Sequence, residues 1–276
     1  MTLRIMVVWP IKPGENVLPS SPDDTASAPG VLYALGLIVV YFLLQVVAGA
    51  AVSLVVGWLE KSRHPNLSQA QVHEHVMTLL QRPDSNALLV ILTLPVIVLL
   101  MLWFVYRTWP ALWARPHSPG FGLTTPSSAS WYPVALLIGL AMPPLGALLT
   151  QLLAHGHAVT QNVEELSRHA SGNLHLPLAI IAVTVGPIIE EVMFRGVLLS
   201  ALMHRLSTRW SVVICAALFG AVHLGGLDFQ WYAVPNLILL AVALCWLRLK
   251  SASLWPAILT HGVYNLFALI ALFAAT

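Results

Sequence analysis

Long apolar runs separated by short polar segments dominate the chain from residue 31 onward. A helix that spans a bilayer needs about 20 predominantly apolar residues, and seven runs reach or nearly reach that length: 31–59, 86–106, 132–154, 174–200, 210–226, 230–248 and 254–274. The fifth run is short and the fourth is long, so the expected number is about seven, with eight as the alternative. The pattern predicts an all-α protein, a polytopic bundle of transmembrane helices.

The polar segments between these runs give two further expectations. Residues 1–30 form a polar tail, because residues 10–30 are rich in Pro, Ser, Gly and Asp, a composition that predicts a flexible segment. Loop 60–85 contains an amphipathic stretch at about residues 67–80, for which we expect a helix at the membrane interface.

Composition agrees with a membrane protein and excludes some partners. Apolar residues make up 58% and charged residues 9% of the chain, and the mean hydropathy is +0.81; soluble domains carry about 25% charged residues. The net charge of +2 is too small to indicate nucleic acid, so membrane lipids are the expected surroundings. Cys215 and Cys245 fall in apolar runs, where we expect neither a disulfide nor a cysteine metal site.

The distribution of Lys and Arg predicts an orientation. With seven spans, one side carries Arg4, Lys12, Arg107, Arg115, Arg205, Arg209, Arg248 and Lys250, and the other carries Lys61, Arg63, Arg82 and Arg168. Basic residues are enriched in cytoplasmic loops. We therefore expect an integral multi-pass protein whose N-terminus is cytoplasmic.

Two adjacent carboxylates, Glu190 and Glu191, interrupt the fourth apolar run. A charge at the centre of a bilayer costs at least about 2.5–3.5 kcal/mol and is often functional. Glu191 and Arg195 are four residues apart and share a helix face, so we expect them to form an ion pair. Glu190 is rotated by about 100° from that face and is left for chemistry. Pro187, which lacks an N–H, is expected to free a carbonyl near Val183 and open the helix just before the glutamates.

Three further polar groups lie in the last three runs. Phe219 and His223 are four apart, as are His261 and Asn265, and Asn236 lies near the start of the sixth run. Counting about 1.5 Å per residue from the span ends places Glu190, His223 and Asn265 at similar depth. We therefore expect these side chains to converge.

A Glu and a His that converge on water form either a general-base site or two ligands of a metal ion. The His261/Asn265 pair would supply N–H donors for an oxyanion. Simpler explanations stay open at this point: a buried ion pair that fixes helix packing, a proton relay of a transporter, a satisfied core histidine, or interhelical hydrogen bonds.

Together these motifs resemble those of the CAAX prenyl protease and bacteriocin-processing (CPBP, Abi) family of intramembrane metalloproteases. The resemblance rests on Glu190-Glu191-x-x-x-Arg195-Gly196, Phe219-x-x-x-His223, and the stretch from Trp246 to Asn265, in the family's order. It covers residues 171–274, which would be the protease core, built on the last four spans. Residues 31–160 would be N-terminal transmembrane helices with their loops.

The resemblance implies roles for six residues. Glu190 would activate water with His223 beside it, His261 and Asn265 would polarise the carbonyl, and Glu191 and Arg195 would support the site. Alternatively Glu190, His223 and His261 would bind a divalent metal such as zinc; a metal-free glutamate mechanism is the other option. Family members often have glycines where this chain has Ala241, Ala243 and Ala252.

The function so implied is an intramembrane endopeptidase that hydrolyses a peptide bond of a membrane-associated protein or peptide. The alternatives are a non-catalytic immunity or scaffold protein of the same family and a proton-coupled transporter, although the chain shows no related halves. Its compactness and short loops suggest a bacterial inner or plasma membrane, so a prenylated substrate is not assumed.

Overall fold

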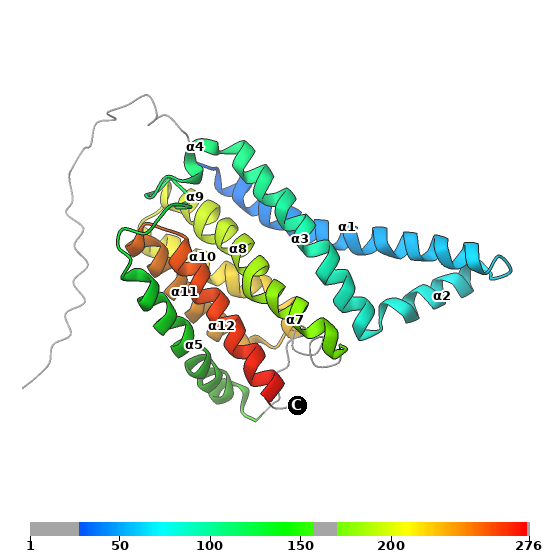
Figure 1. The fold of residues 1–276 in the computed structure, drawn as a ribbon. Coiled ribbons are helices and arrows are strands. Elements are labelled where there is room, and N and C mark those ends of the chain that lie inside the picture. Colours follow the sequence, from blue (N-terminus) through cyan, green and yellow to red (C-terminus); the bar gives the residue numbers. More distant parts are fainter. Residues whose placement is uncertain (1–27, 157–169, 275–276) are drawn as a thin grey trace, which may run out of the picture.

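The computed structural model describes residues 28–156 and 170–274, and over these ranges the chain forms helices and no strands. The prediction of an all-α membrane bundle is confirmed (Figure 1). The predicted polar tail lies outside the described residues except for residues 28–30.

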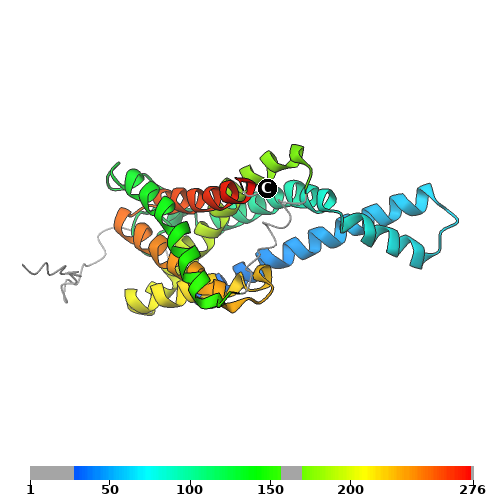
Figure 2. The same cartoon turned by 90° about the horizontal axis from the view of Figure 1, so that it is seen from below.

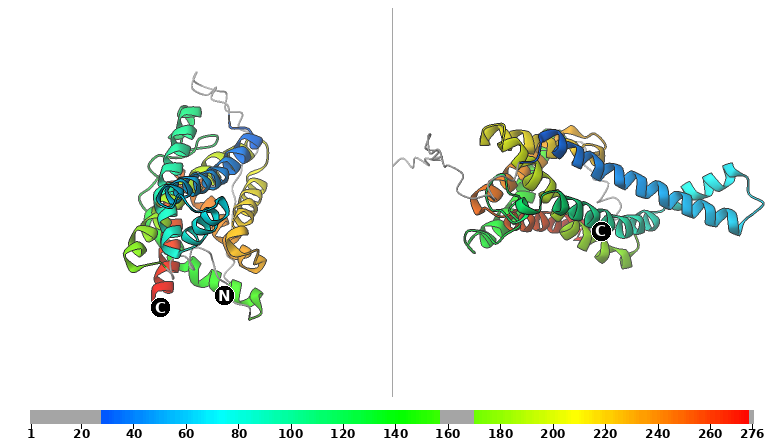
Figure 3. Two further views of the ribbon diagram at one scale, coloured as in Figure 1. Left: turned by 90° about the vertical axis from the view of Figure 1, so that its right-hand side faces the viewer. Right: turned by 90° about the horizontal axis from the view of Figure 1, so that it is seen from above.

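The N-terminal half supplies three long helices and two short ones. These are α1 (Val31–Arg63), α2 (Gln69–Leu80), α3 (Pro83–Thr108), α4 (Pro110–Trp113) and α5 (Trp131–Ala154). The amphipathic helix expected at residues 67–80 is α2. It starts at a capping box in which Ser68 and Gln71 each satisfy the other's backbone N–H. The distal part of α1 and α2 together extend away from the bundle as a hairpin in three views (Figures 1, 2 and 3).

The second half forms the part of the bundle that holds the candidate chemistry. One continuous, irregular helix consists of α7 (Gly172–Ile180), η2 (Ile181–Val185), α8 (Gly186–Glu191), η3 (Val192–Leu198) and α9 (Leu199–Met203). It is followed by α10 (Thr208–Val222), the single turns η4 (Gly225–Leu227) and η5 (Trp231–Ala233), α11 (Val234–Ser251) and α12 (Trp255–Ala274).

All seven apolar runs correspond to helices, with ends displaced by a few residues. Among the described residues, five helical stretches are long and apolar enough to cross a membrane: Val31–Arg63, Pro83–Thr108, Trp131–Ala154, Gly172–Met203 and Trp231–Ser251. Two apolar helices are shorter, Thr208–Val222 and Trp255–Ile270. At 1.5 Å per residue α10 is only about 22 Å long, less than the bilayer's apolar thickness of about 30 Å. The chain is an integral multi-pass membrane protein.

The core is centred on the middle of the irregular helix. Every residue of η3 is buried, and α1, α3, α10 and α11 contribute side chains to the same apolar cluster. Tyr41 of α1 and Val98 of α3 belong to it, so the N-terminal helices pack directly against the segment that carries the glutamates. Cys215 and Cys245 are buried free thiols.

Glycine allows α12 to approach its neighbours closely. A Cβ placed on Gly262 would lie 2.5 Å from the backbone oxygen of Val183 in η2. On the α5 side, a Cβ placed on Gly139 would lie 2.8 Å from Val263. Helix α12 is therefore held between η2 and α5 at a spacing that requires small residues, as in many membrane bundles.

The turn between α11 and α12 has a residue other than glycine in the left-handed region. Ala252 caps α11 with a φ of 57°, in the left-handed region. Glycine adopts this conformation without steric cost, whereas alanine does not. The chain therefore has alanine at a position whose backbone conformation favours glycine.

We predict that Gly262→Ala lowers the melting temperature of the protein in detergent by several degrees. The added methyl group meets a backbone oxygen that cannot move without displacing η2, and overpacking of this kind costs about 1–3 kcal/mol. The control is Gly36→Ala in α1, where a Cβ would have nothing within 4 Å. Equal melting temperatures for the two variants would contradict the proposed close approach.

Candidate active site

The helix that carries the glutamates is not a regular α-helix. Two π-helical segments, η2 and η3, lie on either side of α8, a short α-helix of six residues. Short π-helical segments inside helices are rare and occur frequently at functional sites. Here they change the rotation of successive residues, so side-chain directions differ from those of an ideal helix.

Pro187 frees a carbonyl, but a different one from that predicted. In the π-helical segment η2, Gly186 N–H bonds to the carbonyl of Ile181, five residues back. By the same step Pro187 would bond to Ala182, and it has no N–H to donate. Asn265 Nδ2 of α12 donates to the Ala182 carbonyl instead, at 2.8 Å. The expectation of a free carbonyl near Val183 assumed α-helical spacing and is corrected by one residue.

Glu191 and Arg195 form the predicted ion pair. Arg195 Nη1 lies 2.9 Å from Glu191 Oε1, and both side chains are fully buried. Arg195 Nη2 also donates to the carbonyl of Ala241 at 3.3 Å, and the guanidinium lies 4.4 Å from the centre of the Phe219 ring. Such cation–π contacts add to the stability of a desolvated arginine. The pair joins the irregular helix to α10 and α11.

Glu191 has a second partner that the sequence did not predict. His261 Nδ1 lies 2.9 Å from Glu191 Oε1, the same oxygen that binds Arg195. An ionised carboxylate can only accept, so His261 donates through Nδ1–H. This fixes the imidazole tautomer, and Nε2 of the neutral ring carries the lone pair.

His223 is oriented in the same way by a backbone group. Its Nδ1 lies 2.7 Å from the carbonyl of Phe219, one turn earlier in α10, so Nδ1–H is the donor. Nε2 of the neutral ring is again left with a lone pair. The Phe219 ring lies against both imidazoles, with centroid distances of 4.6 Å to His223 and 5.8 Å to His261.

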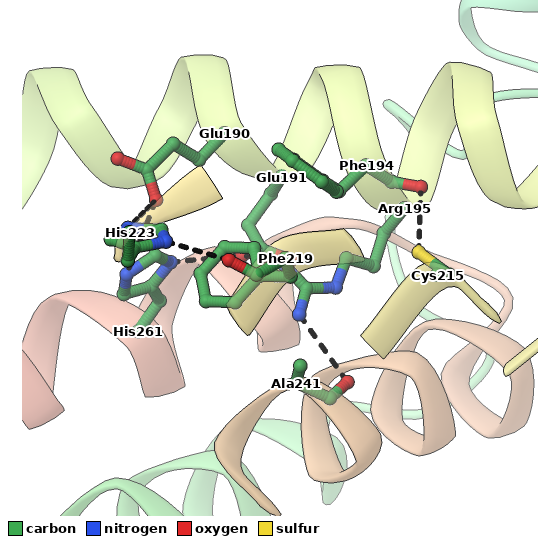
Figure 4. A network of polar contacts seen from close by, with 9 residues as sticks. All are labelled: Glu190, Glu191, Phe194, Arg195, Cys215, Phe219, His223, Ala241 and His261. Carbon is green, nitrogen blue, oxygen red and sulfur yellow. Dashed lines mark hydrogen bonds and ion pairs between the residues drawn. The ribbon is translucent and has the colours of Figure 1, made fainter. Parts of the chain in front are cut away.

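Glu190 faces the two Nε2 atoms. Its Oε2 lies 3.7 Å from His223 Nε2 and 3.8 Å from His261 Nε2, too far for direct hydrogen bonds. Among the described residues this buried oxygen has no hydrogen-bond partner. Figure 4 shows Glu190 and the imidazoles together at one end of the network, with Arg195, Cys215 and Ala241 at the other. When both rings are neutral, Glu190 Oε2 and the two Nε2 atoms are therefore three acceptors that face a common point.

A cavity of about 280 Å³ opens beside these groups. Its polar lining residues are Glu190, His223, His261, Tyr264 and Asn265. The rest of its wall is mainly apolar and comes from α3, the irregular helix, α11 and α12: Val90, Leu94, Leu178, Ile181, Ala182, Leu237, Leu240, Ala268 and Leu269. Glu190 and His223 are partly exposed, with 22% and 33% of their side chains accessible, whereas His261 is 6% exposed. The cavity therefore reaches the first two residues directly.

The predicted metal ligands were compared with this geometry. Two neutral imidazole nitrogens and a carboxylate oxygen are donors that zinc accepts. As they stand, the His, Cys, Asp and Glu side chains of the described ranges form no ready-made cluster of three metal ligands. The metal-free and the metal-dependent route therefore both stay predictions, with Glu190, His223 and His261 as the residues that would hold the ion.

The structure brings together all six residues for which the resemblance implies roles. Asn265 lines the cavity, but one of its N–H groups is engaged by Ala182 rather than directed at a substrate. Asn236 donates to the Tyr264 hydroxyl at 2.8 Å and is not among the residues lining the cavity. Phe219 was noted only as a neighbour of His223, yet it contacts both imidazoles and Arg195.

Comparison with known proteins gives one match. Residues 172–267 match the family model described as type II CAAX prenyl endopeptidase Rce1-like, a range that contains all six residues. Searches of curated proteins and of solved structures found no match.

We predict opposite stability effects for isosteric substitutions at the adjacent glutamates. Glu191→Gln leaves the Arg195 guanidinium buried without a counter-charge, and breaking a buried pair costs about 3–5 kcal/mol. Its melting temperature and its yield of monodisperse protein should fall sharply. Glu190→Gln removes a charge that forms no close ion pair, so its melting temperature should stay at or above that of the wild type. Thermal unfolding of both variants in detergent measures this, and a larger loss for Glu190→Gln would contradict the assignment.

Proposed function

We propose that this chain is an intramembrane endopeptidase, from the site that lies within residues 172–267, the range that matches the type II CAAX prenyl endopeptidase Rce1-like model. It would hydrolyse a peptide bond of a membrane-associated protein or peptide. The observation that carries the proposal is the buried, unpartnered Oε2 of Glu190, faced by two imidazole Nε2 atoms at the edge of a cavity.

Glu190 is the general base in this proposal. A water molecule between Glu190 and the imidazoles would form two hydrogen bonds, one to the carboxylate and one to an Nε2 atom, and would keep both of its protons at this stage. This leaves a lone pair on the water oxygen for attack on the substrate carbonyl carbon. Glu190 takes the proton as the carbon–oxygen bond forms, and then delivers it to the amide nitrogen as the carbon–nitrogen bond breaks.

Asn265 is the candidate donor to the oxyanion. Its amide has two N–H groups, and one of them donates to Ala182. That bond holds the amide at the cavity wall, so the second N–H is pre-oriented to stabilise charge that develops on the carbonyl oxygen. One N–H of Asn265 thus holds the side chain in place, and the other would stabilise the oxyanion.

The walls of the cavity favour an apolar peptide. Leucine, isoleucine and valine side chains from four parts of the chain surround the polar groups. A substrate that enters from the bilayer would place apolar side chains on these walls and its scissile carbonyl beside Glu190. The family name refers to CAAX prenyl substrates; for this chain we propose the wider class of membrane-associated peptides, with or without a prenyl group.

The test is cleavage of fluorogenic peptides with an apolar segment, each made with and without a farnesylated cysteine, by purified protein. We expect Glu190→Gln to reduce kcat by about 100- to 10,000-fold, the usual contribution of a general base. A melting temperature of Glu190→Gln at or above that of the wild type is the folding control. Turnover by Glu190→Gln equal to that of the wild type would exclude the proposed base.

The same assay with a chelator separates two routes. The metal-free mechanism predicts that activity survives the chelator. Loss of activity that is restored by added zinc would support the alternative in which Glu190, His223 and His261 bind a metal. If the correctly folded wild type cleaves none of the peptides, the alternative of a non-catalytic immunity or scaffold protein is favoured.

A further inference from the structure

A second and larger cavity lies where α10 begins and α11 ends. This is the end of the bundle opposite to the connection between α10 and α11. The cavity has a volume of about 670 Å³ and is enclosed by α9, the start of α10, the end of α11 and the loop at residues 117–118. None of the groups proposed for water activation lines it. Arg195, the partner of Glu191, is among its lining residues, but the proposed hydrolysis assigns no step to this cavity.

The polar part of this cavity is basic. Its basic lining residues are His117, Arg195, Arg209, Arg248 and Lys250, of which Arg195 is paired with Glu191. Within the described part of the chain none of its lining residues is acidic. Arg248 is 4% exposed and its guanidinium donates to the carbonyls of Pro116, Gly120 and Phe121. Neutral carbonyls satisfy its N–H groups without compensating its charge. In the described ranges no carboxylate forms an ion pair with Arg248.

The start of α10 adds to the positive potential. The N-cap residue Ser207 makes no side-chain capping bond, and the first turn of α10 contains Arg209 and no acidic residue. The N-terminus of a helix carries partial positive charge and free N–H groups. A cation in this turn is unfavourable unless an anion lies nearby, because both charges have the same sign.

The other wall of the cavity is apolar. Leu199, Met203, Val213, Val242 and Leu249 are among its lining residues, with Trp246 beside them. Tryptophans are enriched at the level of the lipid headgroups, and the exposed Trp210 lies in the same first turn of α10. The cavity therefore combines a basic end at the headgroup level with an apolar wall that continues toward the bilayer.

We propose that this cavity binds the headgroup phosphate of an anionic phospholipid, whose acyl chain lies along the apolar wall. The phosphate would lie between Arg209, Lys250 and the start of α10, near Arg248, with which no carboxylate of the described ranges forms an ion pair. Basic pockets between transmembrane helices are suited to anionic lipid headgroups. Charge complementarity selects the headgroup, and the apolar wall distinguishes a lipid from a free phosphate.

The test measures binding of phosphatidylglycerol to delipidated protein in neutral detergent, by native mass spectrometry and by the shift in melting temperature. Phosphatidylcholine, glycerol phosphate and inorganic phosphate are the comparison ligands. We expect phosphatidylglycerol to bind and stabilise the wild type, and the other three to have little effect. The double variant Arg209→Gln/Lys250→Gln should lower the affinity for phosphatidylglycerol by roughly 30-fold, since each basic residue near a membrane surface contributes about a factor of five.

The matched control is Arg107→Gln/Arg205→Gln. It removes two exposed basic residues predicted for the same side of the membrane, and neither lines the cavity. This variant should bind phosphatidylglycerol as the wild type does. Equal weakening of both variants, or equal binding of phosphatidylcholine by the wild type, would overturn the proposal, as would full binding by glycerol phosphate alone.

Discussion

The burial of one ion pair organises this protein. Glu191 and Arg195 are completely removed from solvent, and neither charge could be kept there alone. The pair contacts three other helices. Arg195 contacts the Ala241 carbonyl on α11 and the Phe219 ring on α10, and Glu191 accepts a hydrogen bond from His261 on α12. Three helices are thereby positioned around a single carboxylate and its partner.

The division of work between the two glutamates follows from this constraint. Glu191 gives one oxygen to both Arg195 and His261, so it is committed to neutralising a charge and fixing a tautomer. Glu190 points elsewhere and retains an unpartnered oxygen beside the cavity. The network that stabilises the bundle thus also sets the direction of His261 Nε2, because the imidazole is held at its other nitrogen. Stability and reactivity are assigned to neighbouring residues that share one helix.

Much of this arrangement could be predicted from local rules. Apolar run lengths located the seven helices, and the four-residue spacing of Glu191 and Arg195 predicted their contact. Depth counting brought Glu190 and His223 together, because helix rise is nearly constant. These inferences depend only on distances along one helix or on the thickness of a bilayer.

The remainder depends on tertiary structure that spacing does not encode. The bond from His261 to Glu191 requires the rotation of α12 about its axis, and that rotation is set by Gly262 against η2. The bond from Asn265 to Ala182 requires the π-helical step at η2, which moves the freed carbonyl by one residue. The role of Phe219 as a platform for Arg195 and both imidazoles required the packing of α10 against α12 across the site.

The basic cavity at the far end adds a second electrostatic theme. Within the bilayer, charge is balanced inside the protein, by Arg195 against Glu191. At the headgroup level the positive charges around Arg248 have no carboxylate among the cavity's described lining residues, and a lipid phosphate is the proposed counter-charge. A charge in the apolar part of the bilayer must be neutralised by another side chain, whereas a charge at the headgroup level can be neutralised by a lipid.

A double-mutant cycle on the ion pair tests the central claim most directly. Melting temperatures would be compared for the wild type, Glu191→Gln, Arg195→Met and the double variant, all in the same detergent. Because each single variant leaves one uncompensated buried charge and the double variant leaves none, the account predicts that the double variant is more stable than the sum of the single losses allows. Additive losses would show that the two charges do not depend on each other, and would contradict the account.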